Sequence, residues 1–140
     1  HIYEFNNDGL SNGDRARCSG YYTFMPSAGD EDSWQFASSC YFNNIFFYAS
    51  GNKIYRWYYN TATSFPTEPW RTLDDLEGAE ITSLAVSPDN QQLYVGVYQP
   101  QASGLNGSFY LLNCNTGKNE GDSPYLNVAY KPLKVVYKPR

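Results

Sequence analysis

The chain has little of what most catalytic and metal-binding sites require. Its 140 residues contain one histidine, at position 1, and three cysteines, Cys18, Cys40 and Cys114, with no Cys-x-x-Cys pair. A zinc site needs three or four closely spaced thiolate or imidazole ligands, so we expect no metal and no cofactor. Without an internal histidine, a serine or cysteine nucleophile lacks its usual base. We expect free thiols, and the alternative is one disulfide between Cys18 and Cys40.

Charge and long apolar runs are also scarce. Only 17% of the residues are charged, and the formal net charge is −4. Nucleic-acid binding needs a clustered basic face, whereas four of the ten basic residues lie within positions 131–140, the pattern of a lysine-rich strand edge. No apolar run approaches the ~18 residues of a membrane helix. We therefore expect neither a nucleic-acid partner nor a membrane-spanning segment.

Aromatic and turn-forming residues are what the chain has in excess. It holds 14 tyrosines, 8 phenylalanines and 3 tryptophans, together with 11 glycines and 8 prolines. Aromatic side chains suit the half-buried surface of a pleated sheet, whereas glycine, asparagine and proline suit tight turns. No stretch keeps a helical period over more than about two turns. The composition therefore predicts an all-β protein.

One strand pattern occurs three times along the chain. NKIYRWYYNTAT at residues 52–63 resembles GSFYLLNCNTGK at 107–118, and a weaker copy, HIYEFNND, opens the chain. The first two copies align at an offset of 55 residues, and the strands before them, 45–49 and 93–97, align at an offset of 48. Other strands are expected at 36–42 and 81–86, and variable fourth strands at 21–25, 71–76 and within 126–137. The repeat therefore predicts a unit of four short strands.

The most specific stretch is ITSLAVSPDNQQLYVGVY at residues 81–98. A strand ending at Val86 is followed by Ser-Pro-Asp-Asn, in which proline presets a turn and aspartate or asparagine tolerates the left-handed conformation that follows. The stretch, with the Asn-Cys-Asn-Thr-Gly ending at 113–117, resembles the blades of YVTN-type and WD-repeat-like β-propellers. That resemblance covers residues 34–118 and implies the fold, with almost no information about a ligand.

The repeat length and strand number together predict part of a β-propeller. A period near 50 residues with four strands is typical of propeller blades, which cannot bury both faces alone. We expect residues 1–33 to end one blade, 34–78 to form a second and 79–140 a third, about two and a half four-stranded antiparallel blades. A closed propeller needs at least four blades, so the expected parent is a larger propeller with this chain as its carboxy-terminal piece. The competing interpretation is a β-sandwich.

A second resemblance concerns style more than motif. The tyrosine- and asparagine-rich blades and the closing strand LKVVYKPR at 133–140 resemble the carboxy-terminal half of PKD-like surface lipoproteins of gut Bacteroidetes. That resemblance implies a bacterial cell-surface or periplasmic protein, anchored to the outer membrane through an amino-terminal region outside this sequence. It also implies a role near glycan uptake, without an established enzymatic activity.

Candidate ligand-binding residues follow from loop length and aromatic exposure. The connection after residue 50 is tight, whereas the one at 99–107 is long, and insertions on one face often carry binding. The candidates are Trp70, Tyr98, Gln99, Gln101 and Asn106. The alternative for Trp70 is packing in the core, and Trp57, inside a strand, is expected to pack between blades. Asn106-Gly107 is a type I′ turn signal, so its Asn-Gly-Ser sequon is expected to serve geometry.

Carboxylates form short clusters without a recognisable spacing. Residues 30–32 and 74–75 are acidic, and neither cluster has the alternating ligands of a calcium loop. No pair is singled out for glycoside hydrolysis, and no nucleophile elbow or phosphate-binding glycine loop is present. Solvated turns are the expected role of these clusters, and we expect no catalytic residue.

Three functions remain open at this point. The first is a non-enzymatic binding or scaffold segment that recognises a glycan or a protein, with the remaining blades or a partner chain beside it. The second is part of a propeller polysaccharide lyase or glycoside hydrolase whose active site lies in other blades. The third is a purely structural pair of blades. We expect the first.

Overall fold

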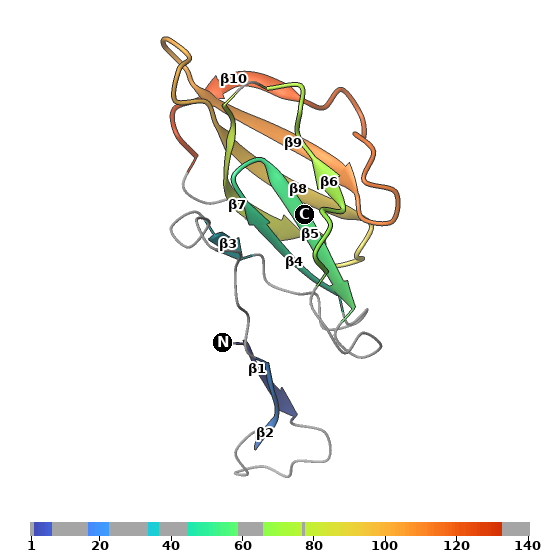
Figure 1. Ribbon diagram of the computed structural model, residues 1–140. Coiled ribbons are helices and arrows are strands. Elements are labelled where there is room, and N and C mark those ends of the chain that lie inside the picture. The colour runs from blue at the N-terminus through green and yellow to red at the C-terminus, as the bar shows by residue number, and fades with distance from the viewer. Residues whose placement is uncertain are drawn as a thin grey trace, which may run out of the picture. The chain divides into compact units, whose positions relative to one another are not determined.

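The described part of the chain is built from β-strands. The computed structural model in Figure 1 describes residues 2–6, 17–22, 34–36, 45–58, 66–76 and 78–132, the first three segments as backbone. These residues form ten antiparallel strands and contain no helix. The chain divides into two compact units, His1–Glu31 and Asp32–Arg140. The prediction of an all-β protein is confirmed for the described residues.

The first unit contains a two-stranded hairpin. Strands β1 (Ile2–Asn6) and β2 (Arg17–Tyr22) pair antiparallel, with an irregularity between Glu4 and Phe5. The strand predicted at the opening of the chain is present. The following strand begins at Arg17, earlier than the predicted 21–25, and residues 23–25 lie outside the described residues.

The second unit begins with a four-stranded sheet, called the first sheet here. Its strands are β3 (Trp34–Phe36), β4 (Ile45–Ser50), β5 (Lys53–Tyr58) and β6 (Arg71–Thr72), paired in that order. A two-residue turn joins β4 to β5, with Gly51 at φ 56°, a left-handed conformation that glycine adopts without steric cost. β6 covers only the beginning of the predicted 71–76, and residues 37–42 of the strand predicted at 36–42 lie outside the described residues.

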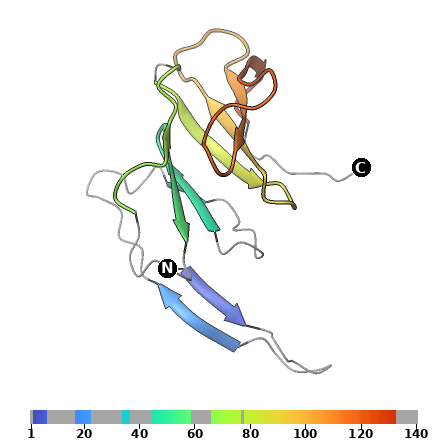
Figure 2. The same ribbon diagram turned by 90° about the vertical axis from the view of Figure 1, so that its right-hand side faces the viewer.

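A second sheet follows with the same strand order. It consists of β7 (Glu80–Val86), β8 (Gln92–Tyr98), β9 (Gly107–Asn113) and β10 (Tyr125–Ala129), again paired consecutively. Figures 1 and 2 show both sheets as meanders, and neither is closed into a barrel. β10 contacts β9 at its two ends and is irregular between them, where Asn127 adopts φ 51°. The fourth strand was predicted within 126–137 and begins one residue before that range.

Two turns of the second sheet are closed by local hydrogen bonds, and the first of them confirms a prediction. The β7–β8 turn is closed by Ser87 N–H donating to the Gln92 carbonyl, and Asn90 has the expected left-handed φ of 59°. At the end of β9, Asn113 Oδ1 accepts hydrogen bonds from the backbone of Asn115 and Thr116, both at 3.0 Å. Asparagine often mimics a backbone turn in this way.

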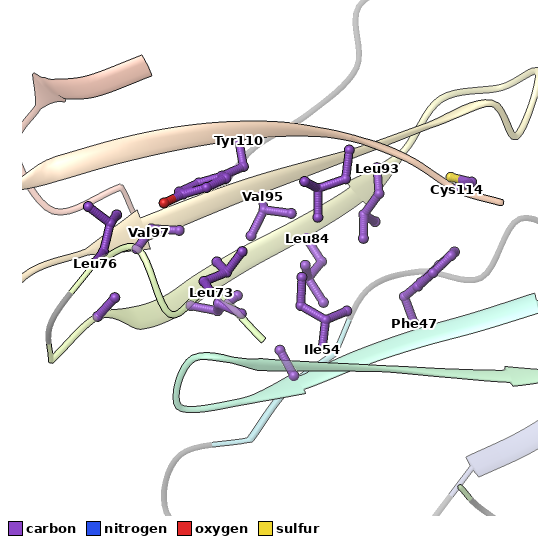
Figure 3. Packing of buried hydrophobic residues seen from close by; sticks show 14 of the residues in the cluster. Phe47, Ile54, Leu73, Leu76, Leu84, Leu93, Val95, Val97, Tyr110 and Cys114 are labelled. Atoms are coloured by element: carbon purple, nitrogen blue, oxygen red, sulfur yellow. The ribbon is translucent and has the colours of Figure 1, made fainter. Parts of the chain in front are cut away.

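The hydrophobic core lies between the two sheets. Alternate residues of β4 and β5 point toward the second sheet, and those of β8 and β9 point back (Figure 3). The buried residues of these four strands in this cluster are Ile45, Phe47, Ala49, Ile54, Leu93, Val95, Val97, Tyr110 and Leu112. Full burial of each large apolar side chain stabilises the fold by about 1.5–3 kcal/mol before entropy is counted. The two sheets therefore stabilise each other.

The strand register shows that the predicted offsets of 48 and 55 do not hold together. β4 pairs with β5 through Phe46 and Trp57, and β8 pairs with β9 through Leu93 and Leu112. If the Trp57–Leu112 equivalence at an offset of 55 is kept, Phe46 is equivalent to Leu93, at an offset of 47. If the predicted offset of 48 is kept instead, Trp57 is equivalent to Leu111, at an offset of 54. The error arose because both strands are apolar on both faces, so alternation does not fix their phase.

Candidate functional site

The long connection at residues 99–106 is held to the end of a hairpin. Gln99 N–H donates to the Asn106 carbonyl at 2.8 Å, and Ala102 N–H donates to the Gln99 carbonyl at 3.1 Å. Gln101 is exposed, as is Leu105, at 41%. The equivalent connection of the first sheet has only two residues, Gly51 and Asn52. The loop is therefore an ordered projection from the second sheet.

Tyr98 lies beside this loop and contacts a cation. It ends β8 and pairs with Glu80 on one side and Gly107 on the other. The Lys131 ammonium lies 4.6 Å from the centre of the Tyr98 ring, within the range of a cation–π interaction. The ring is half-buried, so one of its faces is already occupied by Lys131.

Asn106 and Gly107 do not form the predicted type I′ turn. Such a turn needs positive φ at both residues, and neither has it. Gly107 is instead the first residue of β9, where an added Cβ would lie 2.5 Å from the Tyr130 carbonyl oxygen. Close approach of the chain at 129–132 is therefore what requires glycine here. The Asn106 Oδ1 atom is buried, and the hydroxyl of Ser108 accepts a hydrogen bond from Asn127 N–H.

Trp70 lies between the sheets, away from the loop. Its ring centre is 5.2 Å from that of Phe47, and the Arg56 guanidinium lies 5.1 Å from it. Gly117 packs closely enough that a Cβ there would lie 3.4 Å from the Trp70 ring. The ring is half-buried and packs against the core cluster, so most of its surface is already used.

Arg56 joins the two sheets beside Trp70. One guanidinium nitrogen donates to the carbonyl oxygens of Cys114 and Asn115, at 2.7 and 3.0 Å. These carbonyls belong to the turn that follows β9, so a cation of the first sheet stabilises the open end of a hairpin in the second. Hydrogen bonds from a charged donor are stronger than those between neutral groups.

The predicted site residues therefore fall into two places. Tyr98, Gln99, Gln101 and Asn106 meet at the start of β9, whereas Trp70 contacts Gly117 beyond its end. A seven-residue strand is about 20 Å long, so Trp70 cannot share a ligand-sized site with the loop. The structure brings together four of the five candidates.

A polar network lies on the side of the second sheet that faces away from the first. The Glu120 carboxylate accepts hydrogen bonds from the side-chain amides of Gln92 and Asn113, at 2.9 and 2.6 Å. The Tyr94 hydroxyl donates to Gln92 Oε1 at 3.0 Å. These bonds use most of the polar atoms of the network, so it holds the sheet's end and orients Tyr94.

Two buried tyrosines have hydroxyls that stay protonated. Burial raises the pKa of Tyr48 and of Tyr110, and for Tyr110 the nearby Asp75 carboxylate raises the pKa further while Arg71 lowers it. The Tyr110 hydroxyl makes no hydrogen bond of good geometry among the described residues, although Asp75 is close enough to affect it. A tyrosine with a raised pKa does not act as a base near neutral pH.

Groups suited to metal binding do not gather in the described part of the chain. No cluster of three or more histidine, cysteine, aspartate or glutamate side chains occurs there, and Asp74 and Asp75 are exposed. Cys114 is buried and forms no disulfide, whereas Cys40 and residues 30–32 lie outside the described residues. In the part of the chain that the structure describes, no helix is long and apolar enough to span a membrane.

Comparison with known proteins gives no relative. No protein-family model, no curated protein and no solved structure matches the chain.

Sequence reasoning missed the residues that join the elements. Arg56, Lys131 and Gly107 stood out by neither spacing nor composition. Arginine inside the aromatic strand of residues 53–58 was a weak signal, because a half-buried guanidinium needs acceptors. The carbonyls that it binds are 58 and 59 residues away in sequence, so the partner was not predictable.

Proposed function

We propose that the two sheets are successive blades of a propeller-type repeat protein and that this segment serves binding or scaffolding, without catalysis. The observation that carries the architecture is the order in which equivalent faces pack. With the offset of 55 kept for strands β5 and β9, Phe47 is equivalent to Tyr94 and Ile54 to Phe109. Phe47 and Ile54 point toward the second sheet, whereas Tyr94 and Phe109 point away from the first.

The opposite faces obey the same rule. Tyr55 and Trp57 are equivalent to Tyr110 and Leu112, because they follow the same register. The first pair faces away from the second sheet, whereas Tyr110 and Leu112 face the first sheet and are fully buried. On this alignment, unlike faces of the two sheets meet at their interface.

Head-to-tail packing of this kind distinguishes repeats from symmetric sandwiches. When two similar sheets are related by a two-fold axis, the same face of each meets at the interface. A rotational repeat instead joins unlike faces, as a heterologous interface does. Backbone contact between the sheets also concentrates on β3, β4 and β7, the strands nearest the start of each unit. Successive blades that lie closest together at their first strands would have this arrangement.

The binding role is supported by the loop at residues 99–106. Two equivalent connections differ in length, and the longer one carries Tyr98 at its base and exposed Gln101 and Leu105. Loops that project from a rigid sheet are common binding elements. We propose a glycan or a protein as the ligand and, from the resemblance stated above, a bacterial surface or periplasmic location.

The test replaces residues 99–106 by Gly-Asn, the turn of the first sheet. We expect the shortened chain to keep its circular dichroism spectrum and its cooperative unfolding. Glycan arrays and pull-downs from envelope fractions are then compared for the full chain and the shortened variant. A ligand that binds the full chain and is lost on shortening supports the proposal. Equal binding by both chains, or none by the full chain to any glycan or envelope protein, contradicts the binding role.

A further inference from the structure

The face of the Tyr98 ring carries a cation of the same chain. The Lys131 ammonium lies 4.6 Å from the ring centre, within the range of about 6 Å over which a cation is attracted to an aromatic face. Lys131 is exposed, whereas the Tyr98 ring is half-buried at the end of β8. The ring is therefore held by the sheet, and the ammonium group is the part of the pair that another cation can replace.

Glu80 adds a carboxylate beside this ring. Glu80 and Tyr98 are direct partners in the β7–β8 ladder, so their side chains leave the sheet on the same face, with Cβ atoms about 4.5–5.5 Å apart. The neighbouring Val97 is fully buried in the core, so this face is the one that points away from the first sheet. Glu80 is exposed, and its carboxylate therefore lies at the edge of the Tyr98 ring in contact with solvent.

On the other side of Tyr98 the sheet has no side chain, and the chain beyond β10 lies there instead. Gly107 pairs with Tyr98 in the β8–β9 ladder. A Cβ added at Gly107 would lie 2.8 Å from Pro132 Cδ, so the proline fills this position. Because Lys131 directly precedes Pro132, this contact places the lysine beside the ring. Figure 1 shows the start of β9 and the carboxyl end of β10 at the same end of the second sheet.

We propose that Tyr98 and Glu80 form a site for the ammonium group of a lysine on a partner protein, and that Lys131 occupies this site when no partner is bound. An aromatic face and a carboxylate both attract positive charge, so together they favour a cation over a neutral group. The occupant in the structure is a lysine side chain, which is why a lysine is the ligand that we assign. Binding requires that the lysine of the partner protein displaces Lys131.

This inference rests on the binding role proposed for the loop at residues 99–106, and it names the ligand of that loop as a protein. Gln99 directly follows Tyr98, and its N–H donates to the Asn106 carbonyl, so both ends of the loop lie beside the ring. The sheet would hold the lysine of the partner protein, and the loop would contact the residues next to that lysine.

The test follows saturation-transfer NMR on a blocked lysine, acetylated at its amino end and methylamidated at its carboxyl end. We expect Lys131→Gln to bind this probe about fivefold more tightly than the unaltered chain, because an occupant that covers the ring about four-fifths of the time lowers the apparent affinity by that factor. Lys131→Arg keeps a cation for the ring and should bind no more tightly than the unaltered chain. Equal affinity in Lys131→Gln and the unaltered chain would overturn the proposal.

Variants made together with Lys131→Gln identify the groups that hold the probe. Tyr98→Leu removes the ring but keeps an apolar side chain, and should weaken binding about tenfold, whereas Tyr98→Phe keeps the ring and should stay within about twofold. Glu80→Gln should weaken binding about threefold, because the attraction of an exposed carboxylate is partly screened. Circular dichroism shows whether each variant is folded. Binding that Tyr98→Leu retains in full would come from another place and overturn the proposal.

Two further probes separate charge from shape and protein from glycan. Blocked norleucine has nearly the shape of lysine without the ammonium group, and should bind about tenfold more weakly. Equal binding of the two would make the site apolar and overturn the proposal. Glucosamine carries an ammonium group on a sugar. If it binds through Tyr98 more tightly than the blocked lysine does, the site belongs to an amino sugar, which overturns the assignment to a protein.

The outcome is separate from that of the loop replacement, which leaves Tyr98, Glu80 and Lys131 in place. A chain that gains no ligand from its loop and still binds the blocked lysine through Tyr98 keeps this site and loses only the role of residues 99–106. A chain whose loop carries a ligand while the blocked lysine fails to bind keeps the proposed function and loses this inference.

Discussion

The two sheets have the same strand order but differ in what covers them. In the first sheet, Phe47 and Ile54 are sealed by a neighbour, whereas their equivalents in the second sheet, Tyr94 and Phe109, are half-exposed. Apolar character is therefore kept at these two positions while burial is not. The comparison teaches that burial at these two positions depends on the packing of the other sheet and not on the strand's own composition.

A second difference is the side chain at the position of Arg56, which contacts the turn after β9. Arg56 of the first sheet binds the carbonyls of Cys114 and Asn115, whereas Leu111 at the equivalent position of the second sheet is apolar. The contact between the sheets is thus partly polar, and the face of the second sheet that points away from the first has no equivalent arginine. Two sets of variants test these differences, and a third prediction concerns the β7–β8 turn.

The largest expected effect comes from truncating equivalent aromatic residues. Phe47→Ala removes a fully buried ring from the core and should lower the free energy of unfolding by about 3–5 kcal/mol. Tyr94→Ala removes a half-exposed ring and should cost about 1 kcal/mol. Urea unfolding followed by circular dichroism measures both. Equal losses at the two positions would contradict the difference in coverage.

An intermediate effect is expected from exchanging Arg56 and Leu111. Arg56→Leu removes two charge-assisted hydrogen bonds and a contact with Trp70, and should cost about 2 kcal/mol. Leu111 lies on the face of the second sheet that points away from the first. The matched variant, Leu111→Arg, should therefore change the free energy of unfolding by less than about 0.5 kcal/mol.

Arg56→Lys separates charge from geometry. A lysine keeps the positive charge but lacks the planar fork, so its loss should be about half that of Arg56→Leu. If both Arg56 variants unfold at the denaturant concentration of the unaltered chain, Arg56 does not join the sheets.

The smallest effect concerns pH and the β7–β8 turn. The Ser87 hydroxyl and the Gln91 N–H donate to the Asp89 carboxylate and hold its pKa below the ordinary value for an aspartate, about 3.9. Because the pKa is lower in the folded chain, the ionised carboxylate stabilises the fold above that ordinary value. This contribution is lost as the pH falls through the lowered pKa.

Thermal unfolding of the unaltered chain and of Asp89→Ala checks this expectation. The two midpoints should differ at pH 6 and converge as the pH falls below about 3.9. NMR titration of Asp89 measures the pKa directly. A midpoint difference that is constant from pH 6 to pH 2 would show that the carboxylate's charge contributes nothing to the turn.

Local signals predicted the strands and one turn well. Residues 81–98 contain both strands of a hairpin and the Ser-Pro-Asp-Asn turn between them, because each of these features depends on near neighbours. Gly51 likewise lies in a left-handed turn. The fourth strands were less predictable. β6 has two residues and β10 is irregular, so neither has the alternation that marks a strand.

The site was predictable only in part. Loop length grouped Tyr98, Gln99, Gln101 and Asn106, and these residues lie near one another because they are close in sequence. Trp70 was grouped with them by residue type, although it packs against Phe47 and Arg56 near the other end of β9. Residue type alone does not predict that the Trp70 ring packs near the carboxyl end of β9.

The amino-acid sequence by itself determined the all-β character, the four-stranded unit and its turns, because these depend on alternation, aromatic content and residues a few positions apart. Only the tertiary structure decided which face of each sheet meets the other, that Arg56 binds the carbonyls of Cys114 and Asn115, and that Gly107 makes room for residues 129–132. Strands that are apolar on both faces leave this choice open. Which faces meet is decided by the burial of apolar side chains from both sheets at their interface.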